Sequence, residues 1–119
     1  LRFTTEAERC VDLRQLGPQR YLEFSADSVG RRLAAQRAGA LLTPGAVTLA
    51  DTVLMYVEGG LNTRVTAERL GVHLNTVHNR LERAAEVLAQ PELSPIDLVE
   101  TAIAIRICRS AAAAWTSLR

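Results

Sequence analysis

The stretch AERLGVHLNTVHNRL, residues 67–81, decides the fold class of this chain. It contains the end of one short helix, a glycine at position 71, and a second helix that starts three residues later. Glycine adopts the left-handed conformation at little cost, so Gly71 is expected to end the first helix and turn the chain. Ala67 is small enough for the two helices to approach closely, and Val72 fills the core behind the turn. The pattern predicts a helix-turn-helix centred on residues 62–83.

The second helix, predicted over residues 74–89, has one anchored side and one polar side. Its apolar positions recur every three or four residues and form an inner stripe, namely Val77, Leu81, Ala84, Ala85 and Leu88. Small polar residues open the helix, and further polar residues are left to point outward, namely Asn75, Thr76, His78, Asn79 and Arg80. A helix with one side anchored and the other polar and reachable is typical of helices that read the major groove of DNA.

The sequence on either side of this motif is also helical. The box Thr48–Asp51 is spaced to cap a helix that ends at Gly59 and Gly60. Asn62 is placed to cap the short helix before Gly71. After a break at Pro91, Ser94 as cap and Pro95 at the first helical position predict a long last helix over residues 95–117.

The N-terminal third of the chain predicts two more helices. One runs from Glu6 to Leu16, and the other starts near Ser25 and carries Val29, Leu33, Ala34 and Leu41 on its apolar side. A break at Thr43-Pro44-Gly45 predicts a division into an N-terminal helical region, residues 1–43, and a helix-turn-helix domain, residues 44–119. The predicted fold class is therefore all-α, a helical bundle that contains a helix-turn-helix and has an N-terminal helical extension.

Composition and motifs exclude several classes of protein. The 119 residues suit one compact domain, and the net charge of +1 excludes a polybasic nucleic-acid-binding chain. Cys10 and Cys108 fit no zinc spacing and are expected in the core. His73 and His78 diverge by about 140° on a helix, so we expect no metal site and no cofactor. A glycine-rich phosphate loop and the usual catalytic triads are absent from the sequence, which predicts that the chain is not an enzyme.

The motif resembles the C-terminal helix-turn-helix of PucR/CdaR-type transcription regulators and, more distantly, the Fis-type helix pair. The family pattern His-Arg-Asn-Thr-aliphatic-Arg-Tyr-Arg-Leu is met at His73, Asn75, Thr76, Val77, Arg80 and Leu81. The preceding helix, which ends in YVEGG at residues 56–60, and the following alanine- and isoleucine-rich helix are also similar. The resemblance covers residues 48–110 and does not extend to residues 1–43. It implies that a bacterial regulator uses this domain to bind duplex DNA.

This sequence departs from the family pattern at three positions. The family has arginine at the positions of Leu74 and His78, and tyrosine at the position of Asn79. The two arginines of the family imply contacts with phosphate or guanine, and these two contacts are missing or weakened where Leu74 and His78 stand. Leu74 is suited instead to touch a thymine methyl group, and Asn79 is suited to pair with adenine through two hydrogen bonds.

These observations give a set of expected DNA contacts. Base edges or nearby phosphates are assigned to the opening of the second helix, at Leu74, Asn75, Thr76, His78 and Asn79, and the DNA backbone is assigned to Arg64, Arg69, Arg80 and Arg83. So few cations favour a homodimer that binds two half-sites about 34 Å apart, with the dimer interface on the last helix or in the N-terminal region.

The sequence also implies where the protein acts and leaves two alternatives. It has no signal peptide or membrane span, so we expect a cytoplasmic protein with no membrane partner. Any small-molecule effector is expected to bind an upstream region. The first alternative is a helical interaction or dimerisation module with a degenerate helix-turn-helix. The second is a promoter reader similar to a sigma factor.

Overall fold

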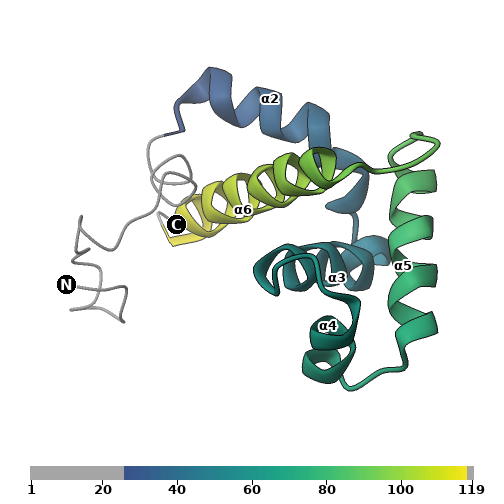
Figure 1. Ribbon diagram of the computed structural model, residues 1–119. Helices are drawn as coiled ribbons and strands as arrows, with labels where there is room; N and C mark the ends of the chain where they lie inside the picture. The colour runs from purple at the N-terminus through teal and green to yellow at the C-terminus, as the bar shows by residue number, and fades with distance from the viewer. Residues whose placement is uncertain (1–25, 118–119) are drawn as a thin grey trace.

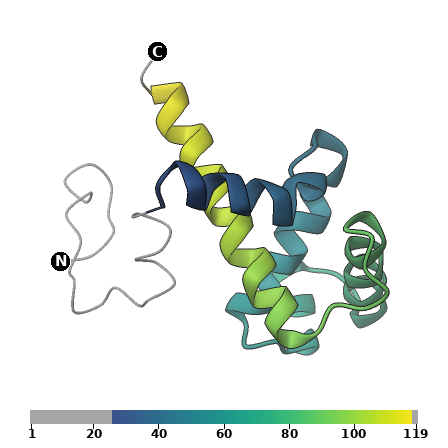
Figure 2. The same ribbon diagram turned by 90° about the horizontal axis from the view of Figure 1, so that it is seen from above.

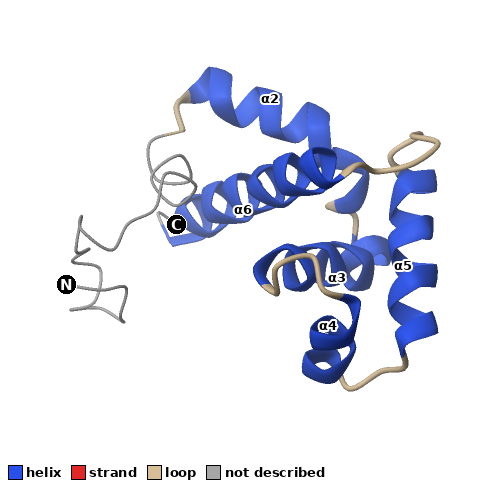
Figure 3. Ribbon diagram, viewed as in Figure 1, coloured by secondary structure: helices blue, strands red, loops and turns tan. Residues whose placement is uncertain are grey.

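The computed structural model describes residues 26–117, with side chains up to Ser110. In this part of the chain the secondary structure is entirely helical (Figure 3). Five α-helices and two short 3-10 helices follow one another in the order α2 (Ser28–Ala38), η2 (Gly39–Leu41), η3 (Pro44–Ala46), α3 (Val47–Glu58), α4 (Thr63–Leu70), α5 (Leu74–Val87) and α6 (Pro95–Ser117). The all-α prediction is therefore confirmed. The predicted helix at residues 6–16 and Cys10 lie outside the described residues.

The helices are arranged around α3, as Figure 1 shows. Helix α3 contacts α4, α5 and α6, and α4 and α5 contact each other. Helix α2 packs on α6, and the two views agree that α2 crosses α6 while α4 and α5 lie at the other end of the molecule (Figures 1 and 2). Helices α4 and α5 thus pack on α3, and α5 also contacts η2, while α2 and α6 pack on each other.

One apolar core joins these helices. Its largest fully buried members are Leu41, Val53 and Ile105. Alanines fill much of the remaining core and allow close approach of the helices, namely Ala34, Ala38, Ala46, Ala50, Ala84, Ala102 and Ala104. Burial of each large aliphatic side chain contributes roughly 1.5–3 kcal/mol to folding. Because residues from α2 and η2 share this core with the rest, the division of the chain at residue 43 stays a prediction.

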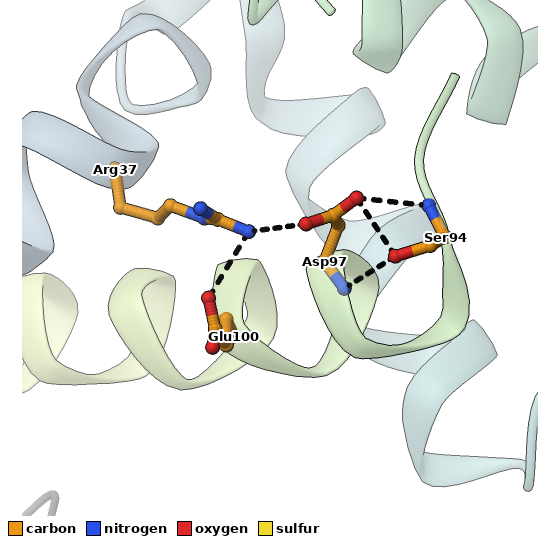
Figure 4. A network of polar contacts seen from close by, with 4 residues as sticks. All are labelled: Arg37, Ser94, Asp97 and Glu100. Atoms are coloured by element: carbon orange, nitrogen blue, oxygen red, sulfur yellow. Dashed lines mark hydrogen bonds and ion pairs between the residues drawn. The ribbon is translucent and has the colours of Figure 1, made fainter.

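Two of the predicted helix starts are confirmed by hydrogen bonds. The Asn62 side-chain oxygen accepts from the backbone amide of Val65 at 3.0 Å and caps α4. Before α6, the Ser94 hydroxyl and backbone amide both donate to Asp97 Oδ2, at 2.8 Å and 3.1 Å, and the Asp97 amide donates to the Ser94 hydroxyl (Figure 4). Pro95 takes the first helical position, where the missing N–H costs nothing. Both starts depend only on neighbouring residues.

Two other predicted boundaries are wrong. Helix α3 already begins at Val47, so Thr48 lies inside it and makes no capping box with Asp51. The 3-10 turn that starts at Pro44 leads directly into the helix, and Ala46 precedes it without a side-chain cap. Helix α5 ends at Val87, two residues before the expected end, because Ala89 adopts a left-handed φ of 58°.

The predicted apolar side of the second N-terminal helix is only half right. The helix is shorter than expected, Ser28–Ala38, and Asp27 caps it by accepting from the amide of Gly30. Ala34 and Leu41 are buried, whereas Val29 and Leu33 are 56% and 59% exposed. Helix α2 presents its alanines to α6, and this leaves the two larger side chains at the edge of the contact.

No single helix among residues 26–117 is long and apolar enough to cross a bilayer. The stretches Ser28–Leu41 and Pro44–Glu58 reach the required length and composition only as a pair, and the pair is bent by 71°.

Candidate nucleic-acid interface

The turn between α4 and α5 is built by glycine at position 71. Gly71 has φ 68° and ψ 35°, the left-handed conformation that side chains oppose. No heavy atom would lie within 4 Å of a Cβ added there, so backbone conformation and not space requires the glycine. The amide of Val72 then donates to the carbonyl of Ala67 at 3.0 Å, which closes the end of α4. The predicted turn is confirmed at Gly71 and Ala67, whereas Val72, which was expected to fill the core, is only half-buried.

His73 caps the N-terminus of α5. Its Nδ1 accepts from the backbone amide of Asn75 at 3.0 Å, and its carbonyl accepts from the amide of Thr76. His73 therefore has a structural role at the turn. Because His73 supplies the cap, the exposed side chain of Asn75 and the half-buried side chain of Thr76 are not needed for this purpose.

Helix α5 is held to the domain by one side. Val77 and Ala84 are completely buried and Ala85 nearly so, while Leu81 packs against the core from the same side. The opposite side is open to solvent. Val77 lies between Asn75, His78 and Asn79 in sequence, and its burial fixes the direction in which these three polar side chains leave the helix.

The structure places every predicted contact residue on α4 or α5. Six of them are polar or charged and exposed, namely Arg64, Arg69, Asn75, His78, Asn79 and Arg83. Leu74 is 37% exposed in the first turn of α5. Thr76 and Arg80 are half-buried. Asn75 and Asn79 are four residues apart and share one face of α5, whereas Arg64 and Arg69 belong to α4.

Two glutamates continue the same face of α5 and were not included among the predicted site residues. Glu82 and Glu86 follow Asn75 by seven and eleven residues, the spacing that returns to one side of a helix, and both are exposed. Glu86 also lies 3.7 Å from Arg83. This helical spacing would have been enough to place Glu82 and Glu86 beside Asn75 from the sequence alone. Carboxylates repel phosphates, so on the exposed face of α5 the first two turns, residues 74–80, are better suited to a polyanion than the turns that follow.

An acidic cleft borders this surface. It has a volume of about 500 Å³ and lies between α5, Tyr56 of α3 and the loop before α6. His78, Glu82, Glu86 and Glu92 all line it. His78 therefore lies at the boundary between the polar face of α5 and an acidic region.

No group of three His, Cys, Asp or Glu side chains in the described part of the chain has an arrangement that could hold a metal ion. Cys108 is a half-buried free thiol against the core, and its burial raises the pKa of the thiol above the usual 9.0. This position agrees with the core role predicted for Cys108.

The comparison with protein families identifies the same region. The model described as the PucR C-terminal helix-turn-helix domain matches residues 49–107, from the first turns of α3 through most of α6. Comparisons with curated proteins and with solved structures gave no significant match. The family indicates DNA binding in transcription regulation and is in general not enzymatic. Residues 49–107 of this chain therefore belong to the PucR C-terminal helix-turn-helix family.

Proposed function

We propose that this domain binds duplex DNA sequence-specifically, with the first two turns of α5 in the major groove, as part of a bacterial transcription regulator. One observation carries the proposal. Residues 74–80 expose Asn75, His78 and Asn79 and contain no carboxylate, while the buried Val77 between them anchors the helix. A groove-reading helix needs this combination of a fixed inner side and a polar outer side.

Each exposed side chain has a role that suits its chemistry. The amide of Asn79 donates to and accepts from the edge of adenine, and Leu74 contacts a thymine methyl group. Asn75 and Thr76, at the N-terminus of α5, meet a phosphate or a base edge through their side chains. His78 contacts the same groove from the border of the acidic cleft. Arg64, Arg69, Arg80 and Arg83 hold the DNA backbone, since guanidinium groups bind phosphate in a forked geometry.

Few cations per chain favour a homodimer. The helix-turn-helix offers four arginines against three glutamates in residues 62–86. Two copies on half-sites about 34 Å apart double the number of phosphate contacts and read a symmetric operator. Because its partner is duplex DNA, the protein acts in the bacterial cytoplasm. An effector would act through a region upstream of this domain.

The test is selection from a pool of random duplex DNA at two salt concentrations. We expect enrichment of a symmetric site, affinity that falls steeply with salt, and loss of both in the double variant Asn75→Ala/Thr76→Ala. Gln36→Ala, an exposed polar change on α2, is the matched control and retains binding. In the same selection, Asn79→Ala should lose roughly 1–3 kcal/mol of preference for adenine at one position. A pool without enrichment even at low salt would refute the proposal.

A helical interaction module is the second candidate, because Val29, Leu33 and Ile96 are large apolar side chains that are more than half exposed. Such a module needs no DNA and shows no salt-dependent enrichment. An interaction module would use the outer surface of α2 and α6. This surface lies apart from the exposed face of α5, so protein association there is compatible with DNA binding by α5.

A further inference from the structure

The cap that His73 provides for α5 depends on the protonation of its ring. Nδ1 accepts from the backbone amide of Asn75 at 3.0 Å, which is the hydrogen bond of an N-cap. A ring nitrogen accepts only while it carries no hydrogen, so the single ring hydrogen of neutral His73 lies on Nε2. A second proton would occupy Nδ1, turn this acceptor into a donor and remove the cap.

The first turn of α5 has few other contacts that fix it. Residues 74–76 come before Val77, and none of them is buried, whereas Val77 is completely buried. The amides of Thr76 and Val77 donate to the carbonyl of His73 at 3.0 Å and 3.3 Å, so the other bonds of this turn end on the same residue. The side chains of residues 74–76 therefore depend on His73 for their positions, while the core fixes the helix from Val77 onward.

The side chain of His73 is exposed, and no ion pair includes it within the part of the chain that the structure describes. The charged or titratable side chains on the two helices that it joins are Arg64, Glu68 and Arg69 of α4 and His78, Arg80, Glu82, Arg83 and Glu86 of α5. On α3, which packs against both helices, Asp51 and Glu58 are paired with arginines of α6. Histidine is the side chain that gains a charge between about pH 8 and about pH 5. The cap is therefore made by a group that can change its charge near neutral pH.

Protonation of His73 has opposite effects on two kinds of DNA contact. A cationic ring attracts phosphate, but phosphate contacts carry no sequence information. Loss of the cap loosens residues 74–76, which include side chains assigned to base edges. A cation at the N-terminus of a helix also opposes the helix dipole, so the charge does not restore the turn. Base preference therefore falls on protonation, whereas affinity for DNA of any sequence does not.

We propose that His73 is a positioning residue that sets the base preference of the first turn of α5, and that it does so only while Nδ1 is unprotonated. The proposal rests on the proposed function and deepens it. His73 acts through Leu74 and Asn75 and needs no contact with a base. Asn79 follows the buried Val77, so base reading by Asn79 is independent of the cap and serves as an internal control.

The first test uses the complete 119-residue chain without DNA. Nuclear magnetic resonance of the ring nitrogens reports which nitrogen carries the hydrogen. We expect Nδ1 of His73 to be unprotonated at about pH 8, and the amide signal of Asn75 to titrate together with the ring as the pH falls to about 5. In His73→Asn, which keeps a capping oxygen that does not titrate, the Asn75 amide should not follow the pH. A hydrogen on Nδ1 at the higher pH would overturn the proposal.

The second test measures base preference at about pH 8 and about pH 5.5, on either side of histidine protonation. The probes are the duplex enriched in the selection above, the same duplex with single base changes, and a scrambled duplex of equal length. At the base pairs whose recognition is lost in Asn75→Ala, we expect the preference of the unchanged chain to fall about five-fold at the lower pH, the typical effect of a lost cap. The preference assigned through Asn79→Ala should not fall. Equal losses at both sets of base pairs would overturn the proposal.

Variants of the two histidines of the chain separate their effects. His73→Asn should keep its base preference at both pH values, and His73→Ala should have a lower preference at both. His78→Ala should still lose preference at the Asn75 base pairs when the pH falls. A loss that persists in His73→Asn or disappears in His78→Ala would assign the effect to His78 and overturn the proposal. A selection without any enriched duplex would refute the proposed function and this proposal with it, whereas the ring measurement without DNA detects a failure that concerns His73 alone.

Discussion

Arg37 on α2 and Asp97 in the first turn of α6 are joined by an ion pair, with Arg37 Nη2 3.0 Å from Asp97 Oδ1, across sixty residues of sequence. The other carboxylate oxygen of Asp97 accepts the two hydrogen bonds from Ser94 that start α6. One side chain therefore caps a helix and fixes a second helix against it. Both side chains are about 30% exposed, so solvent screens the pair and the cap is the larger contribution.

Asp97 should make stability depend on acidic pH. The Ser94 hydroxyl, then the Ser94 amide, and then Arg37 lower the pKa of Asp97 below its ordinary 3.8. The unfolded chain therefore binds a proton at Asp97 at a higher pH than the folded chain. The stabilisation is complete above pH 3.8 and is lost as the pH falls through the folded pKa.

Chemical denaturation between pH 2 and pH 7 measures this effect. Asp97→Asn should lower the free energy of unfolding at pH 7 and flatten its fall below about pH 4. Ser94→Ala should flatten the curve more than Arg37→Met, because hydrogen bonds from Ser94 are the larger cause of the shift. A steeper fall for Asp97→Asn than for the unchanged chain would contradict the assignment.

Gly71→Ala should destabilise the domain by about 1 kcal/mol, because alanine opposes the left-handed conformation at φ 68°. Gly39→Ala is the matched control. Gly39 has a right-handed helical conformation at φ −52°, and a Cβ there would meet no atom within 4 Å. It should be neutral or slightly stabilising. If thermal unfolding showed the same loss of stability for both variants, the left-handed conformation would not be the reason that position 71 needs glycine.

Ala89→Gly should stabilise the domain by about 0.5 kcal/mol. Ala89 has φ 58° after the end of α5 and is exposed, so glycine relieves the strained conformation without leaving a cavity. Ala40→Gly, an exposed alanine in η2 without a left-handed φ, should instead destabilise by a similar amount. Denaturant midpoints that move in the same direction for both variants would count against the explanation.

Arg64→Ala and Arg69→Ala should each make DNA binding less dependent on salt. Each lost phosphate contact reduces the slope of log K against log salt by about 0.9 and weakens binding to all sequences alike. Arg31→Ala is the matched control, because Arg31 is exposed on α2 and donates to the carbonyl of Ala26, away from the helix-turn-helix. An unchanged slope for Arg69→Ala, measured by fluorescence anisotropy, would remove Arg69 from the interface.

Predictions that depended on neighbouring residues were confirmed most often. Gly71, Asn62, and Ser94 with Asp97 mark helix ends through bonds that span five residues or fewer, and each lies where the sequence predicted it. The box at Thr48–Asp51 is an instructive exception. Its spacing fits a cap, but the turn at Pro44–Ala46 starts the helix earlier and leaves Thr48 no amide to accept from.

The sequence by itself determined the helices, the turn at Gly71 and the family of residues 49–107. The reason is that the hydrogen bonds at helix ends join close neighbours in sequence, and the helical period of 3.6 residues can be recognised in a short segment. Only the tertiary structure decided which apolar residues are covered. Val29 and Leu33 fit the apolar period of α2 as well as Ala34 does, yet they lie outside the core. The crossing of α2 over α6, fixed by small alanines and by Arg37 with Asp97, determines this, and no local pattern contains a contact across sixty residues.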